Sequence, residues 1–507
     1  MIKNKIITLL LLAFPLLTVV RAQEASTVRR LERVGERMSE SRHPSLLLYR
    51  NPSLMSYRYD SSMSEFHLGY KSRQTDRAVI AQEGKGNNEA RFEASSYTRL
   101  SEMSTIWGSA SYYNGKTKQL QWNENAHFRK IYPYVVGDDR GGDTKYETYD
   151  FTGGYARKYE KYDIGICMRY VSGKSYRTKD PRPRNTTLDV KLRGGGAWHA
   201  FAGSRLAAYV GAEKYSQDSD IKFMNPLGVS MVYQMTGLGT HYFRFKGDGT
   251  SVRYEGSTFE IGAALMPNGI RGLSLSASAS RRHTEKQLAT KRDIPINDIF
   301  EDLFTAEAAW RNSSLTASQT FKFGARLADR DGQTRIFDDG STFYHEIATA
   351  RPFNMKMAEV YISAAAEKSL GKYNMQVIPV ARWSSLYIKN ISPQKKFETS
   401  EWEAGLRSSV RRSGSVGMLS AEVEFRYSGN IKSTLELGDF DFLSPVESLQ
   451  KNCAALSSSA LMVEASLRYD FMPREYFNTI FIILSGGYSE RGDVHVVNFA
   501  LTAGVTI

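Results

Sequence analysis

Hydrophobic and polar residues alternate along most of the chain. In residues 497–507 the odd positions are mainly apolar and the even positions are polar or small. A period of two places successive side chains on opposite faces of a β-strand. The same alternation recurs in residues 205–213, 273–282, 401–411, 419–427 and 461–471. The pattern therefore predicts many strands that each have one apolar face.

The connections between these strands alternate in length. Short ones fall near residues 100–101, 160–161, 203, 268–272, 312–313, 370–371, 413–414 and 474–475. Longer polar ones fall at about 72–87, 116–145, 173–186, 217–252, 287–302, 327–353, 389–396 and 430–457. A soluble sandwich has no reason to place every long loop at one end. An outer-membrane barrel does so, with short periplasmic turns and long external loops. We therefore predict an all-β fold, a transmembrane antiparallel up-and-down β-barrel.

The predicted barrel has about 18 strands of roughly 10–15 residues, enough to cross a hydrocarbon layer when tilted. A count of 16 is the alternative, because the first strand is the least distinct. The connection at residues 490–493 is one short external turn that breaks the alternation. An even number of strands puts both ends of the barrel in the periplasm. Since lipid leaves no backbone group free to bond to water, residues 493–507 should pair with residues 64–71.

The composition agrees with a membrane barrel. The chain has 29 Tyr, 25 Phe and 40 Gly but only 14 Pro, which suits strands with aromatic girdles. The mean hydropathy of −0.41 resembles that of a soluble protein. That average misleads for a barrel, because each spanning strand is only half apolar. After the N-terminus no stretch approaches about 18 consecutive apolar residues, so no transmembrane helix is predicted.

The N-terminus has the features of a secretory signal peptide, assigned to residues 1–22. Lys3 and Lys5 precede an apolar run, and Val20-Arg21-Ala22 resembles a cleavage site. Residues 23–62 form a periplasmic N-terminal extension or a short plug that enters the lumen, with a flexible tail as the alternative. Residues 63–507 form the barrel. Export of this kind predicts localisation in the outer membrane of a Gram-negative cell.

The positive net charge of the chain indicates which partners it can bind. The formal net charge is +13, and loss of Lys3, Lys5 and Arg21 leaves 13 − 3 = +10. We expect these side chains to face outer-membrane lipid and lipopolysaccharide. Nucleic acid is not an expected partner, because the protein leaves the cytoplasm.

Charged residues gather on the predicted inward faces of two neighbouring strands. These lumen candidates are Glu401, Glu403, Arg407, Arg411, Glu422, Glu424 and Arg426. They could line a solute pathway and shape its electric field. Alternatively, they are cross-strand ion pairs that fill the barrel interior.

The densest basic stretch is YRTKDPRPRN at residues 176–185, in a predicted external loop. Its candidate residues are Arg177, Lys179, Asp180, Arg182 and Arg184. An anion-binding role, a loop-ordering role and a rigid solvated loop apex all remain open. Apolar residues within 223–235 are expected either to pack into the barrel mouth or to contact a partner.

Catalytic and cofactor chemistry is not expected. No His or Cys has metal-ligand spacing, and Cys167 and Cys453 are expected to be free thiols. His283 with Ser278 and Ser280 is the best linear candidate for a hydrolase, an unlikely alternative because Ser is common throughout. The glycines at residues 194–196 are expected to relieve crowding on a curved wall rather than to bind phosphate.

The signal peptide, the YRTKDPRPRN loop and the strand ladder together resemble an uncharacterised outer-membrane β-barrel family of Bacteroidota. That family is similar to accessory barrels of TonB-dependent uptake systems. The resemblance implies a channel or accessory uptake protein for a small solute, with no catalytic residues to assign. It also implies possible partners, a TonB-dependent receptor or a surface lipoprotein. A structural barrel that docks such a partner is the second interpretation. No energy-coupling box is recognisable near Gln23, so the chain itself does not read as a TonB-dependent receptor.

Overall fold

The computed structural model describes residues 27–41, 45–201, 203–225, 231–245, 247, 251–314, 316–338, 344–414, 416–438, 446–472 and 478–507. The expected signal peptide at residues 1–22 lies outside the described residues and stays a prediction.

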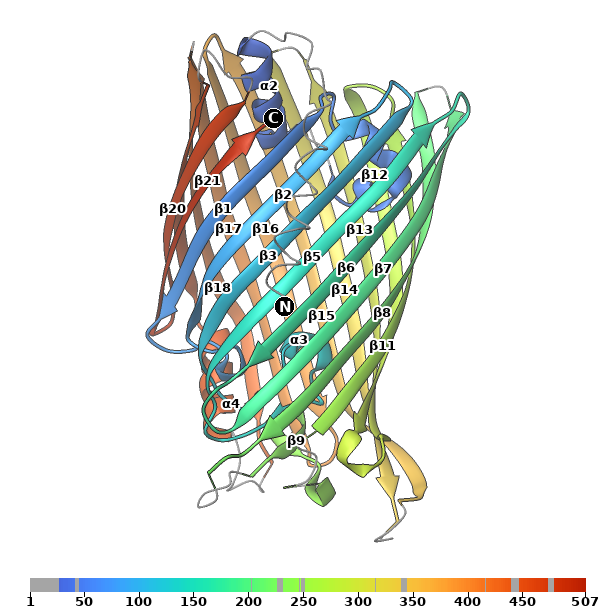
Figure 1. The fold of residues 1–507 in the computed structure, drawn as a ribbon, viewed down its shortest axis with the longest axis vertical. Coiled ribbons are helices and arrows are strands. Elements are labelled where there is room, and N and C mark those ends of the chain that lie inside the picture. The colour runs from blue at the N-terminus through green and yellow to red at the C-terminus, as the bar shows by residue number, and fades with distance from the viewer. Residues whose placement is uncertain are drawn as a thin grey trace, which may run out of the picture.

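Eighteen antiparallel strands form one closed barrel (Figure 1). They are β1 (Met63–Thr75), β2 (Gly86–Arg99), β3 (Ser104–Leu120), β5 (Gly142–Lys158), β6 (Tyr162–Tyr176), β7 (Arg182–Phe201), β8 (Ser204–Lys222), β11 (Ser251–Pro267), β12 (Arg271–Leu288), β13 (Ile294–Ser313), β14 (Ala317–Phe337), β15 (Glu346–Leu370), β16 (Tyr373–Asn390), β17 (Lys395–Ser413), β18 (Gly417–Glu436), β19 (Ala460–Phe471), β20 (Thr479–Arg491) and β21 (Val494–Thr506). Each strand pairs with the preceding and following wall strands. The predicted up-and-down barrel of 18 strands is confirmed.

The last strand closes the barrel on the first. β21 pairs with β1 from Glu65 opposite Thr506 to Thr75 opposite Val496. The predicted partner of the C-terminal strand is therefore correct. Closure gives the backbone groups of both strands a partner, which a sheet in lipid requires.

The outward face of the wall is apolar. On β20 and β21 the outward side chains include Ile480, Ile482, Leu484, Phe499 and Leu501, all exposed. An exposed apolar band of this kind is rare on soluble proteins and is the lipid-facing surface of an outer-membrane barrel. Among the described helices, none is long and apolar enough to span a membrane.

A row of charged residues marks the external limit of the apolar band on four neighbouring strands. Arg281, Asp302, Asp329 and Lys356 lie opposite one another in register on β12 to β15. Arg281 Nε lies 2.7 Å from Asp302, and Lys356 Nζ lies 3.7 Å from Asp329. One rung nearer the periplasm, the outward residues are Ala279, Phe304, Leu327 and Ala358. The strands continue beyond the charged row, so the wall projects outside the membrane.

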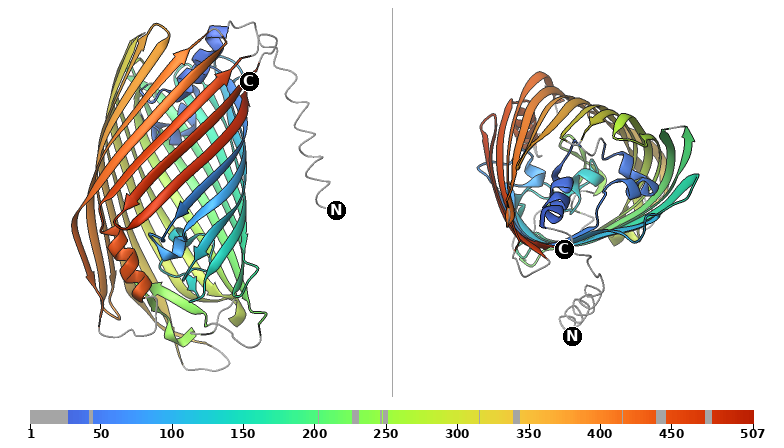
Figure 2. Two further views of the ribbon diagram at one scale, coloured as in Figure 1. Left: turned by 90° about the vertical axis from the view of Figure 1, so that its left-hand side faces the viewer. Right: turned by 90° about the horizontal axis from the view of Figure 1, so that it is seen from above.

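This projection explains why the predicted loops were too long. The loop predicted at residues 173–186 is only residues 177–181, and the one predicted at 327–353 is only residues 338–345. Beyond the lipid both faces of a strand can be polar, so alternation disappears although backbone pairing continues. The predicted alternation of loop length is confirmed only in part, because the external connections after β6, β12 and β16 have five residues or fewer. The connections beside the C-terminus are short, and the long ones, such as those that contain α3 (Phe128–Ile131) and α4 (Val446–Leu456), lie at the other end (Figures 1 and 2).

Both ends of the lumen contain additional elements. At the periplasmic end lie α2 (Thr27–Met38) and two 3-10 helices, η2 (Leu48–Arg50) and η3 (Pro52–Tyr57), which are seen inside the wall in Figure 2. At the external end lie η4 (Ala81–Glu83), α3 (Phe128–Ile131), β4 (Val136–Gly137), β9 (Tyr233–Gly237), β10 (Thr240–His241), η5 (Phe243–Phe245), η6 (Ala289–Lys291) and α4 (Val446–Leu456). β4, β9 and β10 form a small separate sheet.

Candidate functional site

The lumen candidates lie together on the inner faces of β17 and β18. Their contacts are Glu401 with Arg491 (3.1 Å), Glu403 with Arg382 (3.5 Å), Arg407 with Glu424 (3.3 Å), Arg411 with Glu367 (2.6 Å), Arg426 with Glu424, and Glu422 electrostatically with Arg407. Outward neighbours such as Trp402 and Leu406 are exposed to lipid. The structure therefore brings the seven residues together as a largely ion-paired wall.

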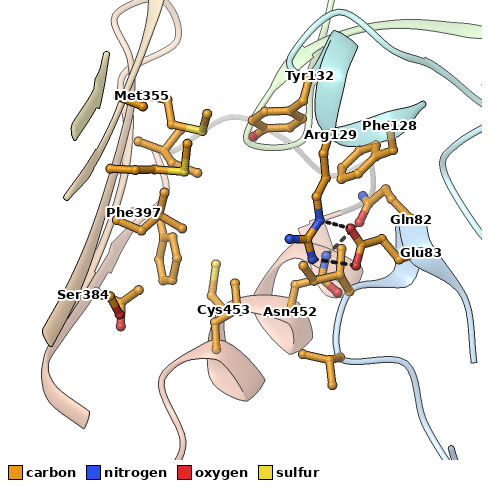
Figure 3. Close-up of a pocket in the computed structure, with 18 of the residues that line it drawn as sticks. Gln82, Glu83, Phe128, Arg129, Tyr132, Met355, Ser384, Phe397, Asn452 and Cys453 are labelled. Carbon is orange, nitrogen blue, oxygen red and sulfur yellow. Dashed lines mark hydrogen bonds and ion pairs between the residues drawn. The ribbon is translucent and has the colours of Figure 1, made fainter. Parts of the chain in front are cut away.

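A cavity of about 1200 Å³ lies inside the external part of the barrel. We call this cavity the chamber. Its loop-side lining includes Gln82, Phe128, Tyr132, Leu238 and Leu449. Figure 3 shows Met355 and Phe397 on the strand side, across from the residues of η4 and α3. Strands from the wall and loops from the mouth thus enclose one space.

One side of the chamber is apolar. Two rungs of the sheet, Met357–Leu386 and Met355–Ile388–Phe397, supply five apolar side chains that we call the apolar wall. The next rung toward the periplasm is polar and contains Arg326, Glu359, Ser384 and Glu401 in register. An apolar surface and a polar surface therefore adjoin along the strands.

The other side of the chamber carries ion pairs. Arg129 donates to Glu83 with Nη2 at 2.9 Å, as Figure 3 shows. Lys130 Nζ lies 2.5 Å from Asp189 and 2.7 Å from Glu213. Each of these charges is compensated locally, which lowers the cost of placing it away from bulk water.

A loop layer at residues 121–141 lines the chamber and packs against the wall, held by a buried ion pair. Arg177 Nη1 lies 3.0 Å from Glu124, and neither side chain is more than 2% exposed. Burial raises the pKa of Glu124, while the adjacent Arg177 opposes that shift. Since Arg177 belongs to the β6–β7 connection, the pair fastens the loop layer to the wall.

The loop candidates divide into two groups. Asp180 accepts hydrogen bonds from the backbone N–H groups of Met224 and Asn225, each at 2.8 Å, and pairs with Arg182 at 2.7 Å. With Arg177, these residues order neighbouring loops. Lys179 and Arg184 are exposed to solvent. A wholly solvated loop apex is therefore wrong for Arg177, because Arg177 turns inward to Glu124.

Protonation of His127 is predicted to weaken the packing of the loop layer in acid. His127 contacts the hydroxyl of Tyr215 through Nδ1 at 3.2 Å, and burial with nearby Lys130 lowers its pKa to about 4. A histidine has a pKa of about 6.5 in the unfolded chain. Protonation of His127 therefore leaves docking of the loop layer unimpaired above pH of about 6.5 and costs about 2 kcal/mol at pH 5. Protonation of Glu124, whose pKa is raised by burial, acts in the opposite direction.

Hydrogen exchange of amides 123–136 at pH 7 and pH 5, corrected for intrinsic rates, measures this effect. We expect the ratio of protection at pH 5 to protection at pH 7 to be lower in the unaltered chain than in His127→Gln, which keeps a polar partner for Tyr215. An equal loss of protection in both proteins would assign the effect to another group.

The N-terminal segment, defined as residues 27–59, is fastened to the wall at β6 to β8. Asn51 Nδ2 donates to the carbonyl oxygens of Gly196 (3.2 Å) and Ala208 (3.0 Å). The hydroxyl of Tyr57 donates to the Asp163 carboxylate at 3.0 Å. Asn51 also caps η3 by accepting from the N–H of Ser53 at 3.0 Å.

Two glycines allow the N-terminal segment to lie close to the backbone of β6 and β7. Gly165 and Gly195 lie opposite each other on β6 and β7. A Cβ at Gly165 would lie 2.4 Å from the carbonyl carbon of Pro52, and one at Gly195 would lie 2.1 Å from Asn51 Oδ1. Gly194 has nothing within 4 Å of such a Cβ. Gly195 therefore makes room for the N-terminal segment. This reason differs from the predicted one, which is relief of crowding on a curved wall.

A second fastening lies on β14 to β17. The Arg411 guanidinium donates to Glu367 at 2.6 Å and also to the carbonyl oxygen of Gly35. Glu367 accepts from the hydroxyl of Ser41 at 2.5 Å. Thr320 donates to the carbonyl oxygen of Ser41 at 2.8 Å. The segment is thus attached to two separate parts of the wall.

Comparison with protein families identifies the chain. The model of a family of unknown function, DUF6850, matches residues 52–507, which is the whole barrel and the end of the N-terminal segment. The chain belongs to the DUF6850 family. A search of curated proteins finds no match.

Several solved structures are similar in architecture to this DUF6850 barrel. The ferric preacinetobactin receptor BauA of Acinetobacter baumannii is 7% identical, with a TM-score of 0.42, and the match covers 88% of this chain and 80% of the receptor. The ferric citrate transporter FecA is 8% identical, with a TM-score of 0.39 and coverage of 90% and 79%. The siderophore receptor PiuA of Acinetobacter baumannii is 7% identical, with a TM-score of 0.38 and coverage of 87% and 81%.

The linear hydrolase candidate is not assembled in the DUF6850 barrel. Ser278 lies on the inner face, where it accepts from Arg50 at 3.1 Å, and Ser280 shares that face. His283 lies on the opposite face and contacts Asp298 at 2.8 Å through Nε2. The proposed grouping is wrong because an odd spacing along a strand reverses the face.

The cysteines and potential metal ligands give no further site within the described residues. Cys167 and Cys453 are both free, as predicted. Burial raises the pKa of the Cys453 thiol to about 12. The described residues contain no group of three or more His, Cys, Asp or Glu side chains placed to hold a metal ion.

Sequence reasoning missed Asn51, Glu367 and Arg326. No pattern in the sequence distinguishes Asn51, and its partners are backbone carbonyls more than a hundred residues away. Glu367 and Arg326 are single charges in alternating strands, a pattern repeated throughout the wall. Only the glycines at residues 194–196 offered a usable signal, since glycine in a strand often marks a close backbone approach.

Proposed function

We propose that this DUF6850 barrel is an uptake protein for a small solute, accessory to a TonB-dependent system. The solute enters the chamber from outside and reaches the periplasm when the N-terminal segment leaves the lumen. The observation that carries this proposal is the chamber of about 1200 Å³ at the external end of a barrel whose periplasmic end holds a separately fastened segment.

The two fastenings suit a removable stopper. They consist of hydrogen bonds and ion pairs from a short segment, with small apolar contacts such as Leu48 and Leu54 against Ala197 and Ala207. Such contacts can be lost without unfolding the wall, whose strands pair with one another independently of the segment. Release of the segment would open the lumen while leaving the barrel intact.

Thiol labelling on intact cells tests entry into the chamber. In a background carrying Cys167→Ser and Cys453→Ser, Ser384→Cys places one thiol on the polar rung of the chamber. We expect a small charged methanethiosulfonate reagent to label it and a large polyethylene-glycol maleimide not to do so. Ile391→Cys, in the exposed β16–β17 connection, is the control and should react with both. Failure of the small reagent to label Ser384→Cys, with Ile391→Cys labelled, would exclude entry from outside.

A second function, docking of a partner, is favoured by exposed apolar residues in the external loops. Phe243 is 79% exposed, and Met224 and Met231 are also exposed. In the same β8–β11 connection, Val232 and Met235 are buried in the mouth, so part of this loop packs inward and part stays exposed. The proposed partner is a TonB-dependent receptor or a surface lipoprotein.

Co-purification from native membranes tests docking. A partner retained by the unaltered protein and lost with Phe243→Ser would support it. Retention of the same proteins by Phe243→Ser and by a triple variant that adds Met224→Ser and Met231→Ser would argue against it.

A further inference from the structure

We infer that the chamber takes an amphipathic anion: an acidic group bound by Arg326, joined to an apolar body that lies on the apolar wall. This inference rests on the proposed uptake function and specifies the class of solute. Arg326, Arg73 and all five residues of the apolar wall line the same cavity.

The first observation is an imbalance in pairing among the charges of the chamber. Arg73 and Arg326 form no ion pair or side-chain hydrogen bond with any residue that the structure describes, and both are exposed to the lumen. The inward carboxylates, in contrast, are occupied. They pair as Glu83 with Arg129, Asp189 and Glu213 with Lys130, Glu301 with Arg330, Glu359 and Glu403 with Arg382, and Glu401 with Arg491.

The nearest acid to Arg326 illustrates this imbalance. Glu359 lies directly opposite Arg326 in the β14–β15 register. Its carboxylate is nevertheless within ion-pair range of Arg382, at 3.8 Å, rather than of Arg326. An incoming anion would gain a charge-assisted contact with Arg326 without displacing a partner. An incoming cation would have to compete with an existing ion pair for every carboxylate named above.

The second observation is the position of Arg326 beside the apolar wall. Ala328, two residues along β14 from Arg326, lies opposite Met357, and Met357 lies opposite Leu386. Arg326 and Met357 are thus diagonal neighbours, a relation that places Cβ atoms about 7 Å apart in a sheet. Met357 and Leu386 are only partly buried, so their side chains retain surface for a ligand. Ser384, on the rung of Glu359, donates to Glu401 at 3.5 Å and adds a hydroxyl at the level of the acidic group.

These neighbours define the shape of the ligand. Its acidic group lies at the level of Arg326 and Ser384, and its apolar body extends toward Met355 and Phe397, on the side of the mouth. A cavity of about 1200 Å³ exceeds the usual range for drug-sized ligands, so it accommodates an aryl or alkyl chain with surrounding water. Aryl-alkyl carboxylates are the simplest compounds of this class.

Binding of matched probes to the full chain in lipid nanodiscs tests the inference. The probes are phenylbutyrate, phenylbutanol, phenylbutylamine and succinate, which separate the effect of charge from that of the apolar body. Calorimetry or saturation-transfer NMR should show binding of phenylbutyrate at least about tenfold tighter than binding of the other three. Arg326→Gln should weaken phenylbutyrate binding by at least about tenfold, and Arg73→Gln by less.

Lys322→Gln is the matched control. Lys322 lies on the same inner face of β14, four residues from Arg326, and does not line the chamber. Its substitution should leave phenylbutyrate binding unchanged. Equal binding of phenylbutylamine, unchanged affinity in Arg326→Gln, or no binding of phenylbutyrate would each overturn the inference. Labelling of Ser384→Cys from outside decides the proposed uptake function separately, because it depends on entry and not on the charge of the solute.

Discussion

Gly165→Ala combined with Gly195→Ala is expected to expel η3 from the barrel wall. The added Cβ atoms would lie 2.4 Å from Pro52 and 2.1 Å from Asn51, far inside contact distance. The segment must move, and Asn51 then loses its hydrogen bonds to β7 and β8. Overpacking and loss of these bonds together should cost about 3 kcal/mol, so amides 51–57 should exchange roughly a hundredfold faster.

Gly194→Ala provides a control on the same strand. The additional methyl group at Gly194 meets nothing within 4 Å, because this residue faces outward. Hydrogen exchange of amides 51–57 should therefore stay as in the unaltered chain. If Gly194→Ala and the double variant changed exchange equally, the effect would come from the strand rather than from contact with the segment.

The second large effect is expected from Arg411→Met. This substitution leaves the Glu367 carboxylate buried without its cation and removes a hydrogen bond to Gly35. Breaking one half of a buried ion pair costs about 3–5 kcal/mol. We expect α2 and residues 39–41 to detach from β15 and β17, with a large loss of amide protection across residues 33–41.

Two further variants define the origin of this effect. Arg412→Met removes the same side chain from the outer face of β17 and should leave amides 33–41 protected. Adding Glu367→Gln to Arg411→Met removes the buried charge and should restore part of the protection. Equal loss of protection in Arg411→Met and Arg412→Met would contradict a specific fastening at Arg411.

The architecture could be predicted from the sequence because lipid imposes a simple rule on the wall. Alternation at residues 497–507 identified a strand with one apolar face, and loop lengths identified the two ends of the barrel. Strand limits were less accurate. Tyr176 and Arg182 were assigned to a loop because their surroundings are polar, yet both belong to strands that pair outside the membrane. Backbone pairing, rather than apolar alternation, stabilises that part of the wall.

The site could be predicted only in part. The seven charges of β17 and β18 were placed correctly inside the lumen, because the period of two fixes their face. Their partners were not predictable, since Arg411 meets Gly35 and Glu367, and Arg407 meets Glu40, across hundreds of residues or several strands. The unpaired state of Arg326 could not be predicted from the residues near it in the sequence. It depends on Glu359 turning toward Arg382, which no spacing within β14 encodes.

Conductance in planar lipid bilayers tests most directly the claim that the N-terminal segment closes this barrel. The comparison is between the full exported chain and the same chain lacking residues 27–59, each inserted at matched protein density. We predict small, infrequent current steps for the full chain and a steady conductance at least about tenfold larger after the deletion, because α2, η2 and η3 lie inside the periplasmic end of the wall. Equal conductance of the two proteins, with both shown to be folded by heat-dependent migration in gels, would contradict the closure of the lumen by this segment.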